Sequence, residues 1–124
     1  MLCFSICSAQ SLRNIKTFWV QEARKHRKNV PHFVVGCKAD LRHCDLETFN
    51  NRRGHLATKV KKEDLLYPWE GREVANNLSL PYYETSVITG AGIDDLFTNA
   101  LRAALLTRRR FWRSHLKSVQ VRLY

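Results

Sequence analysis

The sequence predicts an α/β fold in which a parallel β-sheet is flanked by helices. Three short strand-like segments alternate with segments of helical periodicity, which is the order expected for right-handed crossovers between parallel strands. One of the strands is a continuous apolar run, as is typical of a parallel strand buried on both faces. With 124 residues, of which 44% are hydrophobic, the chain has the size of one domain.

The first predicted elements are a strand and a helix. Leu2–Ile6 is an apolar run rich in strand-forming residues. Ser8 or Ser11 can cap a helix that continues to about Arg27, because apolar residues follow at roughly helical spacing. Trp19 belongs to this apolar set, and we expect it to pack on the sheet.

A break, a second strand and an insert come next. The sequence Asn-Val-Pro at 29–31 ends the helix, and His-Phe-Val-Val-Gly at 32–36 is predicted to form the buried strand. Residues 41–66 are polar and charged and show no clear period almost to their end. We therefore interpret them as an insert between elements of the sheet.

The second half is predicted to add a helix, a strand and a helix. Pro68 suits the first turn of a helix that runs to about Leu78. Tyr82–Thr85 is the third strand, and a Gly-Ala-Gly turn follows it. The strongest amphipathic pattern begins at Ile93, and we expect its apolar positions to face the sheet. Those positions are Leu96, Phe97, Ala100, Leu101 and Ala104.

Basic charge is concentrated near the end of the chain. The net charge is +10, and the segment from Arg102 onward holds seven basic residues and no acidic one. Such a segment can contact nucleic acid, anionic lipid or an acidic protein surface, or it can simply complement the negative end of a helix dipole. We expect no nucleic-acid binding, because no recognition fold accompanies the charge.

Several classes of protein and site are not expected. No apolar run approaches the roughly 20 residues of a membrane-spanning helix, and the first residues do not form a secretory signal. Four cysteines are too few for a disulfide-built domain of this length, so we interpret them as reduced thiols in a cytoplasmic protein. No metal site is predicted, because the spacing matches no known ligand set among Cys3, Cys7, Cys37, His43 and Cys44.

Two loops follow predicted strands, where open parallel sheets place their ligands. In the loop Gly36–Leu41, the Asp40 carboxylate can accept two hydrogen bonds from a guanine edge, and the Lys38 stem can lie along the base. In the loop Glu84–Thr89, backbone N–H groups can hold a carbonyl oxygen of the same base, with the Ser86 hydroxyl orienting the turn. Each motif alone is more often an ordinary charged loop, but the two together, each after a strand, are more specific.

The chain contains the segments CFSICSAQSLRNIKTFW, VPHFVVGCKADLR, GREVANNLSLPYYETSV, DDLFTNALRAALLTRRR and RRRFWRSHLKSVQ. Through these segments, most of the chain resembles the C-terminal half of a Rho-family small GTPase, and in detail the atypical Rho-BTB subfamily. The resemblance implies a partial P-loop-NTPase-like, Ras/Rho-type fold that lacks the N-terminal half of the domain. It implies that residues 1–120 are this half, that residues about 42–66 are the Rho insert, and that residues 121–124 stay unplaced.

The resemblance also assigns a base-binding site. Cys37 stands where the family motif has asparagine, and Ile88 stands where a second motif has lysine. A thiol replaces the amide poorly, and the second change removes a cation, so both departures weaken the expected grip on guanine. The residues that the resemblance assigns to base binding are Cys37, Lys38, Asp40, Ser86 and Val87.

The parts of the family that bind phosphate are not found in these 124 residues. There is no G-x-x-x-x-G-K-S/T motif to hold phosphates and Mg²⁺, and no D-x-x-G motif. We therefore expect no catalytic residue, no Mg²⁺ site, and weak or absent binding of GTP or GDP by the chain alone. The C-terminus has no C-a-a-X cysteine, so no lipid anchor is expected.

Three functional hypotheses follow from the resemblance. The chain can be a fragment of a GTP-binding protein of small-GTPase signal transduction, and we expect it to hydrolyse no GTP by itself. It can be a non-catalytic adaptor module of a Rho-BTB-type protein that binds protein partners and is linked to cullin-based ubiquitin ligases. It can also be a non-functional product of a truncated reading frame. A sheet cut beside its first strand also predicts an exposed edge and poor solubility.

Overall fold

The computed structural model describes residues 1–27, 29–53 and 57–120, except for the side chains of residues 109–120. The predicted tail at 121–124 and the basic side chains beyond Arg108 lie outside the described residues. Within the described ranges, no helix combines the length and the apolar character needed to cross a bilayer.

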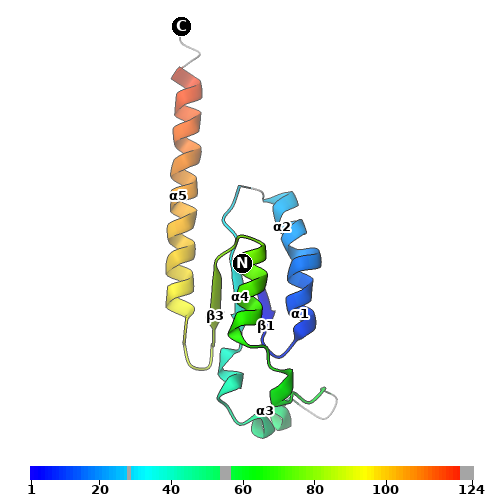
Figure 1. The fold of residues 1–124 in the computed structure, drawn as a ribbon. Coiled ribbons are helices and arrows are strands. Elements are labelled where there is room, and N and C mark those ends of the chain that lie inside the picture. Colours follow the sequence, from blue (N-terminus) through cyan, green and yellow to red (C-terminus); the bar gives the residue numbers. More distant parts are fainter. Residues whose placement is uncertain (28, 54–56, 121–124) are drawn as a thin grey trace.

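A parallel sheet of three strands, in the order β1-β2-β3, forms the centre of the fold (Figure 1). The strands are β1 (Leu2–Ser5), β2 (Val34–Cys37) and β3 (Tyr82–Thr85). In the register, Val34 lies between Leu2 and Tyr82. The predicted fold class, a parallel α/β sheet with flanking helices, is confirmed.

β2 begins two residues later than predicted and includes Cys37. Where a strand begins depends on its hydrogen bonds to the neighbouring strands. Leu2 N–H donates to the Phe33 carbonyl at 2.7 Å, and Val34 N–H donates to the Pro81 carbonyl at 2.9 Å. The ladder therefore starts at this point, although the apolar run begins earlier.

The helices occupy the connections and are capped by local side chains. Ser8, rather than Ser11, caps the first helix, because its hydroxyl accepts from Ser11 N–H at 3.2 Å. Pro68 occupies the first turn of α4 as predicted, and Glu70 accepts from Tyr67 N–H at 2.7 Å. The helical elements are α1 (Ala9–Asn14), the π-turn η1 (Ile15–Trp19), α2 (Val20–His26), the 3-10 turn η2 (Ala39–Arg42), α3 (Leu46–Arg52), the 3-10 turn η3 (Lys62–Asp64), α4 (Pro68–Asn77) and α5 (Ile93–Gln120).

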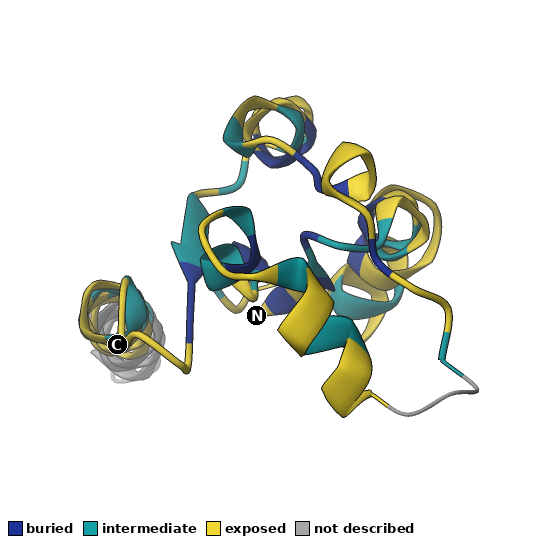
Figure 2. Cartoon of the chain, turned by 90° about the horizontal axis from the view of Figure 1, so that it is seen from below, coloured by how far each residue is buried: buried dark blue, intermediate teal, exposed yellow. Residues whose placement is uncertain are grey.

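Helices cover the two faces of the sheet to different extents (Figures 1 and 2). On one face, α1, η1, α2 and α4 enclose the larger core, which includes Phe4, Ile15, Val34 and Ala75. On the other face, α5 packs a smaller cluster of Phe33, Val35 and Leu96 against the sheet. Figure 1 shows α5 standing beside β3 and continuing well beyond the sheet.

Trp19 does not pack on the sheet, so that expectation is wrong. Its side chain is 51% exposed, and it meets the exposed Phe18 edge to face with ring centroids 4.9 Å apart. The π-turn η1 widens the helical repeat. The buried positions are taken by Ile15, the first residue of η1, and by Val20, the residue directly after it. The two aromatic side chains are thereby turned toward solvent.

The apolar stripe of α5 is only partly buried, which also differs from the expectation. Leu96 is buried and Ala100 packs against its cluster, but Phe97 is 59% and Leu101 is 62% exposed. Cys3 pairs with Val35 in the register and so shares its face of the sheet, yet Cys3 is exposed. α5 therefore covers the part of this face near β2 and β3 and leaves β1 uncovered, which is unusual for a parallel sheet.

The uncovered apolar side of α5 predicts self-association of the purified chain. We expect Leu101→Glu to reduce binding of an apolar dye and aggregation by light scattering while leaving helix content unchanged, because Leu101 is exposed. The matched change Ala100→Glu places the charge in the cluster under α5 and is expected to lower stability instead. Equal behaviour of the two variants would contradict the packing of α5 described above.

Candidate functional site

The two loops that follow β2 and β3 meet at the carboxyl end of the sheet. The Ser86 hydroxyl donates a hydrogen bond to Asp40 Oδ1 at 2.5 Å. Ser86 is only 1% exposed, whereas Asp40 is half-buried. Thus two residues 46 positions apart, which the sequence placed in separate loops, form one polar pair.

Lys38 turns the chain sharply at the end of β2. It has a φ of +66°, in the left-handed region that few residues other than glycine adopt, and its side chain is exposed. The turn lets Asp40 enter η2 directly after the strand. Cys37 lies on the last position of β2 and is half-buried.

The turn after β3 presents backbone donors beside Asp40. Thr89 N–H donates to the Ser86 hydroxyl at 3.2 Å, and Ser86 N–H donates to the Ala91 carbonyl at 3.0 Å. Val87 is 85% exposed, and within the described part of the chain the N–H groups of Val87 and Ile88 donate to no protein atom. These two amides are available to a carbonyl oxygen of a ligand.

A pocket of about 610 Å³ opens at this place. Of the five predicted site residues, it is lined by Cys37, Lys38, Asp40 and Val87, and Ser86 supports it from behind through Asp40. The sequence reasoning missed a further part of its wall, which comes from α3 and includes Phe49 and Arg52. These residues lie in the segment that shows no clear period, so no sequence signal indicated their position.

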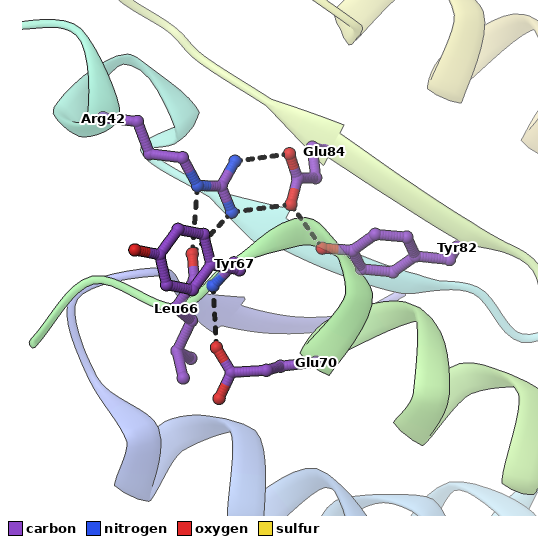
Figure 3. A network of polar contacts seen from close by, with 6 residues as sticks. All are labelled: Arg42, Leu66, Tyr67, Glu70, Tyr82 and Glu84. Atoms are coloured by element: carbon purple, nitrogen blue, oxygen red, sulfur yellow. Dashed lines mark hydrogen bonds and ion pairs between the residues drawn. The ribbon is translucent and has the colours of Figure 1, made fainter.

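A network around Arg42 holds the first loop in place (Figure 3). Arg42 donates to both carboxylate oxygens of Glu84, Nη1 at 2.7 Å and Nη2 at 2.9 Å. Its Nε and Nη2 also donate to the Leu66 carbonyl at 3.0 and 2.7 Å, and the Tyr82 hydroxyl donates to Glu84 Oε1 at 2.6 Å. One side chain thus joins η2, β3 and the segment before α4.

The charges in this network stabilise one another. Burial raises the pKa of Glu84, but hydrogen bonds from Arg42 and Tyr82 outweigh it and leave that pKa below its ordinary value. The hydrogen bond to Glu84 raises the pKa of Arg42. Burial of the Tyr82 side chain and, to a smaller extent, its hydrogen bond to Glu84 raise the pKa of Tyr82. At neutral pH the Glu84–Arg42 pair is therefore fully charged.

This arrangement predicts a loss of stability in acid. The pKa of Glu84 is lower in the folded than in the unfolded chain. Ionised Glu84 therefore stabilises the fold at pH values above its unfolded pKa of about 4.3, and this stabilisation is lost as the pH falls through its folded pKa. We expect Glu84→Gln to be less stable at neutral pH and to lose less stability in acid. Urea unfolding midpoints at several pH values measure this difference. The control variant Glu73→Gln changes an exposed carboxylate and should show the same pH dependence of the midpoint as the unsubstituted chain.

The chemistry of the site is recognition through hydrogen bonds. Asp40 supplies a carboxylate acceptor, the turn supplies two amide donors, and Lys38 and Arg52 add positive charge at the rim. Among the described residues, no three potential ligands of the types His, Cys, Asp and Glu form a group that could hold a metal ion.

Comparison with known proteins gives consistent matches over this chain. The model of the Ras family matches residues 1–106. Rho-related BTB domain-containing protein 1 of Mus musculus is 52% identical over 97% of this chain and 18% of its own length, and that of Homo sapiens is 51% identical over the same shares. Rho-related BTB domain-containing protein 2 of Homo sapiens is 49% identical over 97% of this chain and 17% of its own length. The chain thus spans less than a fifth of these relatives.

Proposed function

Because this chain belongs to the Ras family and is similar to Rho-related BTB domain-containing proteins, we propose that it is the base-binding half of a Rho-type guanine-nucleotide-binding domain. In this proposal residues 1–120 form that half and residues about 42–66 are the Rho insert. Its site residues are Cys37, Lys38, Asp40, Ser86 and Val87.

The observation that carries the proposal is the hydrogen bond from Ser86 to Asp40. It orients the carboxylate toward the pocket and uses only one lone pair of Oδ1, so both oxygens can still accept from a ligand. Guanine presents a ring N–H beside an exocyclic NH₂, which match two such acceptors, whereas adenine lacks this pair. The free amides of the turn after β3 suit the carbonyl oxygen of the same base.

Binding by these 124 residues is expected to be weak and without hydrolysis. They contain no G-x-x-x-x-G-K-S/T motif, and phosphoryl transfer depends on positioned phosphate and Mg²⁺ ligands. Cys37 and Ile88, which replace the family's asparagine and lysine, weaken base recognition further. We also propose a cytoplasmic location, because the four cysteines are free thiols and thiols stay reduced in that compartment.

A nucleotide titration tests the proposal. We expect guanosine and GTP to bind equally, with a Kd on the order of 1 mM, and Mg²⁺ to make no difference, because these residues contain no phosphate-binding motif. Asp40→Asn should abolish the preference for guanosine over adenosine, whereas the exposed Asp94→Asn should retain it. Tight Mg²⁺-dependent binding of GTP, or an Asp40→Asn variant that keeps the preference, would contradict it.

A second candidate function is that of an interaction module in a Rho-BTB-type protein. It is favoured by two aromatic pairs on the surface, Phe18 with Trp19 edge to face and Tyr67 stacked on Trp69. Each of these four side chains is at least half exposed. Aromatic side chains are common anchors of protein interfaces. Binding of a purified cullin by the chain, lost in Trp19→Ala or Trp69→Ala, would support an adaptor role.

A further inference from the structure

We infer that α3 forms a third wall of the base pocket, so that the pocket binds a purine nucleoside through its base and the group attached to that base. This inference rests on the proposed function and extends it, since neither base-recognition loop includes α3. The pocket volume of about 610 Å³ lies within the usual range for small-molecule sites.

The pocket wall is contributed by three segments that are separate in sequence. The loop after β2 contributes Lys38 and Asp40, and the turn after β3 contributes Val87. The α3 region contributes Phe49 and Arg52. Figure 1 shows α3 beneath the sheet, at the end where β2 and β3 run into these loops.

α3 is anchored on both sides, so its place beside the pocket is built into the fold. Asp45 caps its first turn by accepting from Glu47 N–H at 3.0 Å and from Thr48 N–H at 3.3 Å. Asn50 exchanges two hydrogen bonds of 2.8 Å with the backbone of the buried Val60. These contacts fix the helix and leave Phe49 and Arg52 on the pocket wall.

The chemistry of this wall suits a flat ring with a polar substituent. Phe49 is half-buried, packs against the main core and carries the Arg53 guanidinium 5.5 Å from its ring centroid, which restrains the ring. Aromatic side chains bind nucleobases by stacking without regard to their sequence. Arg52 is exposed and, in the described ranges, forms no hydrogen bond or ion pair with the protein, so its guanidinium is available to oxygens of the substituent.

Two cysteines allow a direct test by thiol footprinting. Cys37 lies on the β2 side of the pocket and Cys44 on the α3 side, whereas Cys3 is exposed on β1 and does not line the pocket. Alkylation by N-ethylmaleimide is followed by mass spectrometry with and without guanosine. At about five times its Kd, guanosine is expected to slow alkylation of both Cys37 and Cys44 by roughly sixfold and to leave Cys3 unchanged.

Substitution of Phe49 tests the same wall by affinity. Phe49→Leu retains apolar packing but removes the aromatic face, and it should weaken guanosine binding by about tenfold. The matched control is Phe97→Leu, because Phe97 is exposed on α5 and does not line the pocket. Helix content by circular dichroism shows that each variant is folded.

The possible results separate this inference from the proposed function. Slowed alkylation of both Cys37 and Cys44, together with weaker binding by Phe49→Leu, supports the third wall. Slowed alkylation of Cys37 alone, or an unchanged affinity of Phe49→Leu, overturns the role of α3 and leaves base binding by the two loops intact. No change at either cysteine, with no guanosine binding in the titration, overturns both.

Discussion

Replacing Gly92 by alanine is expected to destabilise the fold by about 3 to 5 kcal/mol, at the upper end of single substitutions. Gly92 has a φ of +71°, and a Cβ atom built there would lie 2.0 Å from the Glu84 carbonyl oxygen on β3. That oxygen belongs to the backbone and cannot rotate away. The first turn of α5 would therefore have to separate from the sheet.

Gly90 provides a matched control in the same turn. Its φ is +76°, but a Cβ atom there would meet no atom within 4 Å. Gly90→Ala should thus cost only the backbone strain of the left-handed region, about 1 kcal/mol. Urea unfolding of both variants measures the difference, and equal losses of stability would show that α5 does not approach β3 as described.

Replacing Arg42 by alanine is expected to lower the free energy of unfolding by about 3 kcal/mol, the lower end for breaking a buried ion pair, because the pair keeps some access to solvent. The substitution leaves the Glu84 carboxylate and the Leu66 carbonyl without the four hydrogen bonds from Arg42. It also removes the contact that holds η2, and with it Asp40, against β3. We therefore expect guanosine binding to weaken as well.

Two controls separate this role from a general effect of charge. Arg13→Ala removes an exposed arginine that bonds Gln10, and should change stability little. Arg42→Lys keeps the charge but cannot bond both Glu84 oxygens and the Leu66 carbonyl at once, so it should restore only part of the loss. Full recovery with lysine, measured by urea midpoints, would argue against the bidentate geometry.

The predicted elements agree closely with the structure where the signals are local. Ser8 caps the first helix and Pro68 begins α4, because capping and proline geometry depend on a few neighbouring residues. Asp40 and Ser86 were predicted to share a site, and they meet because parallel strands end at the same edge of the sheet. Whether they bind a base stays a prediction.

Exposure was predicted less well, because it depends on what packs against a side chain. Trp19 fits an apolar helical repeat until the π-turn shifts the repeat, and a turn of that kind has no clear signal in composition. Phe97 and Leu101 fit the stripe of α5, but the helix covers only part of its face of the sheet. An amphipathic pattern shows that a helix has an apolar side, but it does not show how much of that side is covered.

The sequence by itself determined the order of the strands and of the helices outside the insert, the parallel sheet and the two loops at its carboxyl end. These features follow from periodicity and turn chemistry within short windows. Only the tertiary structure decided that Arg42 joins η2 to β3 and that α3 lies beside Asp40. The first contact joins residues 42 positions apart, and the second depends on how α3 packs against the loops at the end of the sheet. How close these residues lie in space depends on how the whole backbone packs, and no local pattern of residues predicts that packing.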